Sequence, residues 1–368
     1  MGFHNALPPH ICERTLQSGM WGYVRYNTFI GAWIVFQMLK PGKDPLVGAV
    51  NVSSEFDPNS DFVLHEGDCL DLLQKLPSGL AKLIVTSPPY NLGKSYEKRL
   101  ELDTYVEQQR RVIEQCVRIL HEQGSLCWQV GNYVDRGKIV PLDIALFPIF
   151  DSLGLSLRNR VVWHFEHGLH SSKRFSGRYE VILWFTKGGE YTFNLDAVRV
   201  PQKYPRKKYF KGPKKGQYSG NPLGKNPGDL WNIPNVKANH VEKTTHPCQF
   251  PVELIERLVL SMTDERDWVL DPFMGVGTSA IAALMHGRKA ICAETQAEYI
   301  DIARSRIREA EQGKLRIRPL DRPVYDPDNP DIQVPPQSVH INGISTQDRL
   351  FQRPPNYDPS DLHPTPDD

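Results

Sequence analysis

The sequence lacks the features that most quickly assign a chain to a membrane, a secreted or a strongly charged class. Its N-terminal apolar run, residues 28–39, is shorter than the roughly 20 apolar residues that cross a bilayer. It has no basic start followed by a small-residue cleavage site, so we expect neither a membrane span nor a signal peptide. The formal net charge is only +1, so any affinity for nucleic acid must come from local clusters of charge.

Cysteine is scarce and follows no pattern. The six cysteines form no Cys-x-x-Cys pair and have no histidine at zinc spacing; they are Cys12, Cys69, Cys116, Cys127, Cys248 and Cys292. Scattered single cysteines are typical of reduced thiols in the cytosol. We therefore predict a cytoplasmic protein with no disulfide bond and no structural metal.

The chain does have the length and composition of a soluble enzyme. Its 368 residues, 40% hydrophobic and 24% charged, can form one α/β core with an insertion and tails. Short β-branched runs alternate with amphipathic runs, which predicts a doubly wound, mostly parallel sheet. The predicted strands are 62–68, 81–86, 124–130, 158–163, 179–186, 268–270 and 289–293. The predicted helices are 69–76, 104–121, 139–153, 252–262, 278–286 and 298–313.

Residues 269–284 form a glycine turn between a buried strand and a helix. Asp271 and Pro272 end the strand, and Gly275 and Gly277 let the backbone turn tightly and approach a ligand closely. Unpaired amides at the helix start would face that ligand. As a bare pattern, the turn fits dinucleotide binding, with Glu294 after the next strand placed to bind ribose hydroxyls.

A second motif lies far upstream, where an apolar strand ends in the corner Ser87-Pro88-Pro89-Tyr90. Beyond the glycine turn, only one strand and one helix precede a proline-rich stretch. The other strands of a nucleotide-binding sheet must therefore come from upstream, and we expect the corner to belong to the same sheet.

Together the two strand ends resemble the amino-directed DNA methyltransferases, which use S-adenosylmethionine. In that family Ser/Asp-Pro-Pro-Tyr/Phe is the catalytic corner and Asp-Pro-Phe-x-Gly-x-Gly-Thr holds the cofactor. The order found here, corner first and glycine turn last, resembles the circularly permuted β-class. The resemblance covers residues 61–310 and implies a Rossmann-like methyltransferase fold with a DNA-recognition insertion.

The resemblance also implies roles for residues around the cofactor. The loop from Phe273 to Thr278 lies beside the methionine part, Asp271 faces its ammonium group and Glu294 binds the ribose. Asp68, after an upstream strand, contacts the adenine, although an Asp at a helix start is also an ordinary N-cap.

Residues 244–251 resemble the family's His-Pro-Thr-Gln-Lys-Pro segment, which touches the methionine half of the cofactor. His246 and Gln249 are retained, whereas Cys248 and Phe250 replace the usual Thr and Lys.

The chemistry expected at the corner is a direct methyl transfer. The lone pair of an exocyclic amine is conjugated into the base, so two acceptors must hold its hydrogens out of the ring plane. The Ser87 hydroxyl and the Pro88 carbonyl are those acceptors, and Pro89 keeps the corner rigid. Tyr90 offers a face on which a flipped base can stack.

Residues 199–226 contain nine basic and no acidic residues, interleaved with aromatics. Such a run suits a phosphate backbone, although a solvated loop would look the same. The lysines that we expect to bind double-stranded DNA are Lys207, Lys208, Lys211, Lys214 and Lys215. The predicted organisation is an N-terminal extension (1–60), a catalytic half (61–198), the basic insertion (199–240), a cofactor half (241–315) and a proline-rich tail (316–368). Residues 91–98 are predicted to form part of a lid.

Several alternatives stay open. Asn91-Leu92 after the corner resembles the adenine-N6 enzymes and Ser87 the cytosine-N4 enzymes, and we favour adenine. A protein or RNA methyltransferase, an inactive nucleic-acid-binding regulator and a nicotinamide-dependent oxidoreductase are further alternatives. The resemblance further implies a bacterial, nucleoid-associated protein, a homodimer and a restriction endonuclease partner.

Overall fold

The computed structural model describes residues 49–93, 99–135, 137–168, 170–204, 206–237 and 239–322. All of them belong to one contact unit, Pro45–Asp368. Most of the predicted lid, the first 48 residues and the tail beyond residue 322 lie outside the described residues.

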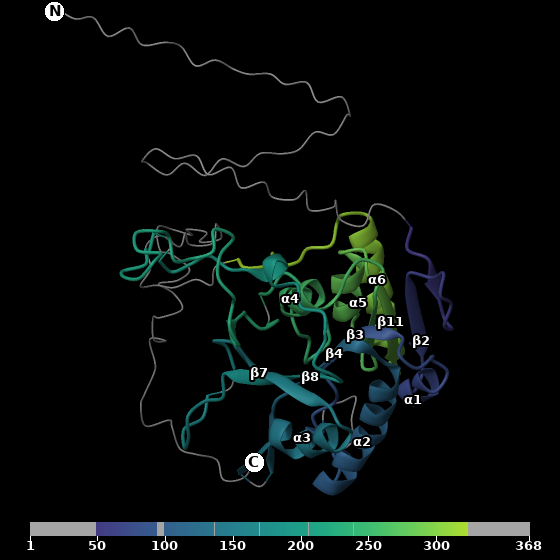
Figure 1. Cartoon of the computed structure of the whole chain (residues 1–368). Coiled ribbons are helices and arrows are strands. Elements are labelled where there is room, and N and C mark those ends of the chain that lie inside the picture. Colours follow the sequence, from purple (N-terminus) through teal and green to yellow (C-terminus); the bar gives the residue numbers. More distant parts are fainter. Residues whose placement is uncertain are drawn as a thin grey trace, which may run out of the picture. The chain divides into compact units, whose positions relative to one another are not determined.

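A nine-stranded sheet, in the order β1-β2-β11-β10-β3-β4-β8-β7-β9, forms the centre of the fold (Figure 1). All neighbouring strands pair in parallel except β8, which is antiparallel to both β4 and β7. The strands are β1 (Val52–Ser53), β2 (Phe62–Glu66), β3 (Ala81–Thr86), β4 (Leu120–Val130), β7 (Ser156–His164), β8 (Tyr179–Thr186), β9 (Leu230–Asn232), β10 (Trp268–Asp271) and β11 (Lys289–Glu294). The predicted doubly wound, mostly parallel sheet is confirmed.

Alternating apolar side chains divide the core into two layers. In β3, Leu83 and Val85 join one buried cluster and Ile84 joins the other, as the two-residue period of a strand requires. The first cluster packs under α4 (Val252–Met262), α5 (Thr278–Leu284) and α6 (Ala297–Glu311). The second packs under α1 (Cys69–Leu73), α2 (Leu102–Ile119) and α3 (Leu142–Ser152). Strands covered on both faces read as continuous apolar runs, which is why they are visible in the sequence.

The pairing of β3 with β10 brings the two sequence motifs together. The two strands are parallel, with Leu270 opposite Ile84, so their carboxyl ends meet at the same edge of the sheet. Thr86, the last residue of β3, donates its hydroxyl hydrogen to Asp271 Oδ1 over 2.5 Å. The serine-proline corner and the glycine turn follow directly from this shared edge.

Two segments differ from the predicted elements. Residues 139–141 are not helical, because they form β6 (Lys138–Pro141) in a hairpin with β5 (Asn132–Asp135). Gly137, with φ of 80°, turns the hairpin, and Pro141 caps α3 in an extended conformation. The short strand β9, which pairs with β7, was not predicted.

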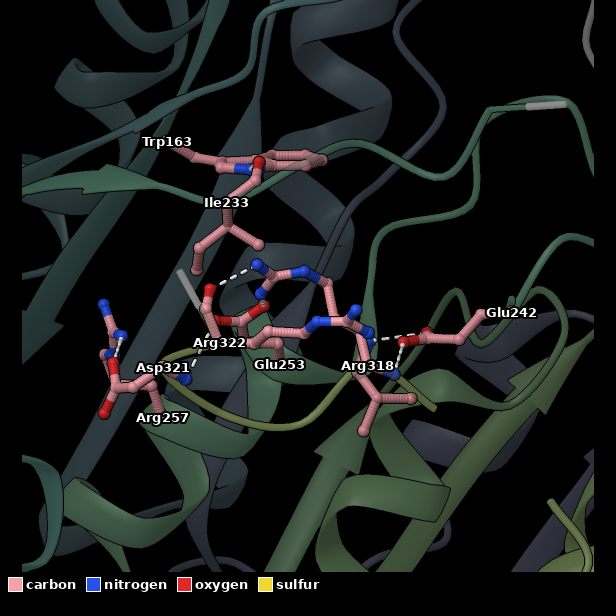
Figure 2. Close-up of polar contacts among 9 residues, drawn as sticks. Trp163, Ile233, Glu242, Glu253, Arg257, Arg318, Asp321 and Arg322 are labelled. Atoms are coloured by element: carbon pink, nitrogen blue, oxygen red, sulfur yellow. Dashed lines mark hydrogen bonds and ion pairs between the residues drawn. The ribbon is translucent and has the colours of Figure 1, made fainter. Parts of the chain in front are cut away.

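The packed structure extends beyond the predicted limits of the catalytic domain at both ends. In the predicted N-terminal extension, β1 pairs with β2, and the ring of Phe56 lies 5.8 Å from that of Trp268. In the predicted tail, Arg318 is buried against α4 (Figure 2).

The cysteines that the structure describes are free thiols. In the described part of the chain, no group of three or more potential metal ligands is present. No helix there is long and apolar enough to span a bilayer.

Candidate active site

A pocket opens where the strands β2, β3, β10 and β11 end. Five sequence segments and the start of α6 line it, and they come from both halves of the chain. Most of the residues singled out in the sequence line this one pocket: Asp68, Ser87, Pro88, Pro89, Tyr90, His246, Gln249, Phe273, Gly275, Thr278 and Glu294.

Asp271 lies behind the pocket and does not line it. The residue is fully buried, and its carboxylate accepts hydrogen bonds from the Thr86 hydroxyl, the Ser279 hydroxyl and the amide of Phe273. Burial raises the pKa of Asp271 to about 6. In this arrangement Asp271 ties β3 to the glycine turn, and its expected contact with a ligand's ammonium stays a prediction.

The two glycines of the turn have separate tasks. Both have positive φ, 56° at Gly275 and 82° at Gly277, which favours glycine. A Cβ at Gly275 would lie 3.3 Å from His246 Nε2 and project toward the pocket lining. A Cβ at Gly277 would lie 3.0 Å from the Cβ of Ala303 in α6, so Gly277 permits helix packing and does not line the pocket.

Glu294 fixes the shape of the glycine turn. Its Oε2 accepts from the amide of Gly275 over 2.9 Å, and its Oε1 accepts from the amides of Thr295 and Gln296, also over 2.9 Å. Burial raises the pKa of Glu294. A carboxylate offers about four lone-pair sites, so Glu294 can accept one further hydrogen from a ligand in the pocket.

Asp68 does cap a helix, as its ordinary interpretation predicts. Its Oδ1 accepts from the amide of Leu70 over 2.8 Å at the start of α1. No described residue donates to the second oxygen, and Asp68 lines the pocket. Capping and ligand binding are therefore compatible.

His246 is neutral near pH 7. Burial, with the positive charges of Lys243 and Arg306 nearby, lowers the pKa of His246 to about 4. Its Nδ1 accepts from the amide of Cys248 over 3.3 Å, and its ring packs edge-on against Tyr299, with 4.5 Å between ring centroids. Tyr299, at the start of α6, also lines the pocket and was missed because nothing in its sequence surroundings marks it.

Gln249 holds its own segment in shape. Its Oε1 accepts from the Thr244 hydroxyl over 2.8 Å, and its Nε2 donates to the Glu242 carbonyl over 2.9 Å. Phe250 is buried in the core under α4, which explains why a phenylalanine replaces the family's lysine there.

Hydrogen bonds hold the Ser-Pro-Pro-Tyr corner in shape. The hydroxyls of Ser87 and Tyr90 lie 2.9 Å apart, and the Tyr105 hydroxyl donates to the Pro89 carbonyl over 2.9 Å. No described residue donates to the Pro88 carbonyl. Tyr90 is only 9% exposed, so most of its ring packs against protein.

Glu180 is the main residue of the corner that sequence reasoning missed. It is the second residue of β8, and its Oε2 accepts the hydrogen of the Tyr90 hydroxyl over 3.0 Å. A single acidic residue in the otherwise apolar strand 180–185 was the signal that could have marked it.

The predicted DNA-binding lysines lie on the surface. Lys207, Lys208, Lys211, Lys214 and Lys215 are all exposed, and none forms an ion pair with a described carboxylate. Two of them lie over tyrosine rings, Lys208 over Tyr218 at 5.3 Å and Lys214 over Tyr209 at 5.9 Å.

A second exposed basic segment, residues 166–178, links β7 to β8 and was not predicted. It includes Lys173 and Arg174, and Phe175 is 99% exposed. The segment returns to the sheet next to Glu180, because Phe165 donates its amide hydrogen to the Arg178 carbonyl over 2.8 Å.

Comparison with known proteins agrees with this geometry. A family model described as DNA methylase matches residues 81–305, more than half of the chain. The chain belongs to this DNA methylase family, which confirms the resemblance seen in the two motifs.

Two relatives and one solved structure show which kinds of DNA methylase this chain is similar to. The Type II methyltransferase M.BglII of Bacillus subtilis is 52% identical over 254 residues, which cover 69% of this chain and 71% of that protein. The DNA adenine methyltransferase YhdJ of Escherichia coli strain K12 is 31% identical over 259 residues, which cover 69% of this chain and 85% of that protein. The solved structure of the cytosine-N4-specific PvuII DNA methyltransferase aligns with a TM-score of 0.55 at 22% identity, covering 75% of this chain and 98% of that one. At that identity the likeness shows the fold alone.

Proposed function

We propose that this chain transfers a methyl group from S-adenosylmethionine to an exocyclic amine of a base in double-stranded DNA, at a specific sequence. The observation that supports this most strongly is the convergence of the Ser87 to Tyr90 corner and the glycine turn on one pocket.

The pocket suits a positively charged sulfonium cofactor. The neutral His246 adds no repelling charge, and Glu294 has acceptor capacity left for a ribose hydroxyl. Asp68 has one oxygen free for an adenine amine, and Gly275 leaves room that a side chain would fill. Phe273 and Thr278 complete the wall beside the methionine part. Asp271 and Gly277 stabilise this wall from behind.

The corner residues act on the base. The Ser87 oxygen and the Pro88 carbonyl accept the two amine hydrogens, so the nitrogen lone pair turns out of conjugation and toward the methyl donor. When bound, the cofactor supplies an electrophilic methyl group. Transfer would form a nitrogen–carbon bond while the sulfonium leaves as a neutral thioether, and the amine held by Ser87 and Pro88 would release one proton to solvent. The exposed part of Tyr90 stacks against the flipped base.

Two residues and one relative bear on which base is methylated. The adenine-N6 prediction was based on Asn91, but in the structure this residue is buried at φ of 61°, and its side chain bridges the backbone of Leu100. Asn91 therefore has a structural role that does not depend on the base. Ser87 favours cytosine-N4, whereas the adenine methyltransferase YhdJ, at 31% identity, favours adenine-N6. We keep adenine-N6 and cytosine-N4 as the two candidates.

Binding to DNA is assigned to the lysines of residues 199–226, assisted by the segment 166–178. The lysines between residues 207 and 215, and Lys173 and Arg174 of the second segment, are exposed and form no ion pair with a described carboxylate, which suits a phosphate backbone. The Type II names of the relatives further support a restriction endonuclease partner in a bacterial host. A homodimer is proposed from the family resemblance alone.

One experiment tests the reaction and the base together. Purified chain, radiolabelled S-adenosylmethionine and unmethylated genomic DNA are incubated, and the DNA is then digested to nucleosides for mass spectrometry. We expect N6-methyladenosine or N4-methylcytidine as deoxynucleosides, with strong loss of product for Ser87→Ala, on the order of 100-fold for a lost catalytic hydrogen bond. Label in RNA or protein instead, or stabilisation by NAD equal to that by S-adenosylmethionine, would reject the proposal.

A further inference from the structure

A partly buried hydrogen-bond chain leads from the catalytic corner to Glu180, a residue that the reaction described above does not use. It runs from the Ser87 hydroxyl to the Tyr90 hydroxyl, 2.9 Å away, and from Tyr90 to Glu180 Oε2 over 3.0 Å. The Gln129 amide donates to the same oxygen of Glu180. The chain therefore connects the ends of three strands, β3, β4 and β8, at the point where the base must bind.

The number of hydrogens decides the direction of this chain. A phenol has one hydrogen, and Tyr90 gives it to Glu180, since a carboxylate can only accept. In the 2.9 Å contact between the two hydroxyls, Ser87 must then be the donor. Its only hydrogen points to Tyr90, and its remaining lone pairs are left to accept from the pocket side.

Without Glu180 the direction is not fixed. Tyr90 could then donate to Ser87, and the hydrogen of the serine hydroxyl could rotate toward the pocket. Such a serine would present a donor to an amine that is itself a donor, and one of the two acceptors that the transfer requires would be lost.

We propose that Glu180 is a positioning residue for methyl transfer, which acts through Tyr90 to keep the Ser87 oxygen an acceptor for the target amine. The inference depends on the proposed function, because the accepted hydrogens are those of a DNA base. Glu180 itself is not among the residues that line the pocket.

The surroundings keep this chain in one arrangement. A Cβ at Gly131 would lie 3.2 Å from Tyr90 Cε2 and 3.4 Å from Glu180 Cγ, so a glycine there lets the tyrosine ring and Glu180 pack closely against the backbone. Burial and the neighbouring Glu180 raise the pKa of Tyr90 well above its ordinary value, so the phenol keeps its hydrogen. Burial also raises the pKa of Glu180, whereas the hydrogen bonds from Tyr90 and Gln129 and the charge of Lys237 lower it.

The test uses single-turnover methyl transfer with pre-bound DNA and saturating cofactor. Glu180→Met keeps a similar length but removes the acceptor, and we expect its rate to fall on the order of tenfold, the worth of one buried hydrogen bond. Glu180→Gln retains an acceptor oxygen for Tyr90 and should restore most of the rate. Glu190→Met, at an exposed carboxylate beyond the other end of β8, is the matched control and should transfer like the wild type.

A double-mutant cycle separates positioning from support of the fold. Tyr90→Phe removes the hydroxyl through which Glu180 acts, so adding Glu180→Met to Tyr90→Phe should lower the rate little further. Equal losses from Glu180→Met in both backgrounds would overturn the proposal, and so would a Glu180→Gln variant as slow as Glu180→Met. Thermal stabilisation by S-adenosylmethionine should be unchanged in every variant, and its loss would mean that Glu180 serves the fold. If the wild type transfers no methyl group to DNA, the proposed function itself fails, independently of these comparisons.

Discussion

Gly275 and Gly277 are two positions apart and both need positive φ, yet the structure gives them different neighbours. A side chain at Gly275 meets His246, which lines the pocket, whereas one at Gly277 meets Ala303 in α6. The motif is visible in the sequence, but the different roles of the two glycines are not, because those roles depend on segments that lie on either side of the turn.

Gly275→Ala and Gly277→Ala should therefore fail in different ways. Each substitution costs about 1 to 2 kcal/mol, because alanine must adopt a left-handed backbone. Gly277→Ala also places a Cβ against α6, so this variant should unfold at the lower temperature. Gly275→Ala should lose more of the stabilisation by S-adenosylmethionine. Thermal unfolding of both variants with and without cofactor checks this. Equal loss of cofactor stabilisation in both would show that the glycines act as one unit.

His246 makes stability depend on pH in a specific window. The unfolded residue has a pKa near 6.5, and the folded one has a pKa of about 4, so only the unfolded chain takes up the proton between these values. Its contribution to stability is present above pH 6.5 and is lost as pH falls toward 4. Between pH 7 and pH 5 we expect the free energy of unfolding to fall by on the order of 1 to 2 kcal/mol more in the wild type than in His246→Gln. Urea titrations at both pH values measure it, and parallel losses would show that His246 is not buried as described.

Asp271 and Glu180 mark the limit of prediction from residues. Asp271 stands in the motif, but its partners Thr86 and Ser279 come from different elements, and only their convergence shows that the carboxylate is used inside the protein. Glu180 stands outside both motifs and acquires its role only because β8 pairs antiparallel to β4 beside the corner. Hydrogen-bond partners at long sequence distance are not encoded in local patterns.

The central strands and helices were predictable because their physics is local. Strands covered on both faces are uninterrupted apolar runs, and β3, β8, β10 and β11 lie close to their predicted limits. The hairpin of β5 and β6 was missed because Ile139 and Val140, apolar and next to a helix, fit either element. The short edge strand β9 has three residues, too few for a period to show.

Residues 314–322 pack against the domain, which their composition alone does not predict. Within this charge-rich stretch, Arg318 is buried and pairs with Glu253 of α4, while its amide donates to Glu242 over 3.0 Å (Figure 2). Asp321 pairs with Arg257 of the same helix. Charged partners on α4 hold this segment, together with Leu315 and Ile317, which pack against the core under that helix.

Arg318→Met should destabilise the protein by about 3 kcal/mol or more, because it leaves the buried Glu253 without its counter-charge. Arg322→Met is the matched control, since the Arg322 side chain is exposed, and it should change stability by less than about 0.5 kcal/mol. Urea unfolding of both variants measures the difference. A loss in Arg318→Met no larger than in the control would show that Glu253 finds another partner.

The net charge of +1 conceals an uneven distribution over the molecule. Carboxylates balance the cations elsewhere, in pairs such as Arg266 with Asp61 and Arg304 with Glu66, whereas the lysines between residues 207 and 215 have no such partners among the described residues. The net charge does not reveal this uneven distribution, but the run of basic residues between 199 and 226 in the sequence does. Electrostatic affinity for DNA should therefore come from this surface.

Replacing Lys207, Lys208, Lys214 and Lys215 by Gln should flatten the salt dependence of DNA binding. Each phosphate contact contributes about 0.9 to the slope of log affinity against log salt concentration, so loss of four contacts lowers the slope by up to about 3 to 4. Fluorescence anisotropy with a duplex between 50 and 200 mM salt measures it. The matched control replaces Lys75, Arg111, Lys138 and Lys314, which are equally exposed and change the net charge by the same amount. If both sets flatten the slope equally, only net charge matters and the insertion is a solvated loop. If only the first set flattens the slope, and stabilisation by the cofactor is unchanged, the DNA phosphates contact the insertion directly.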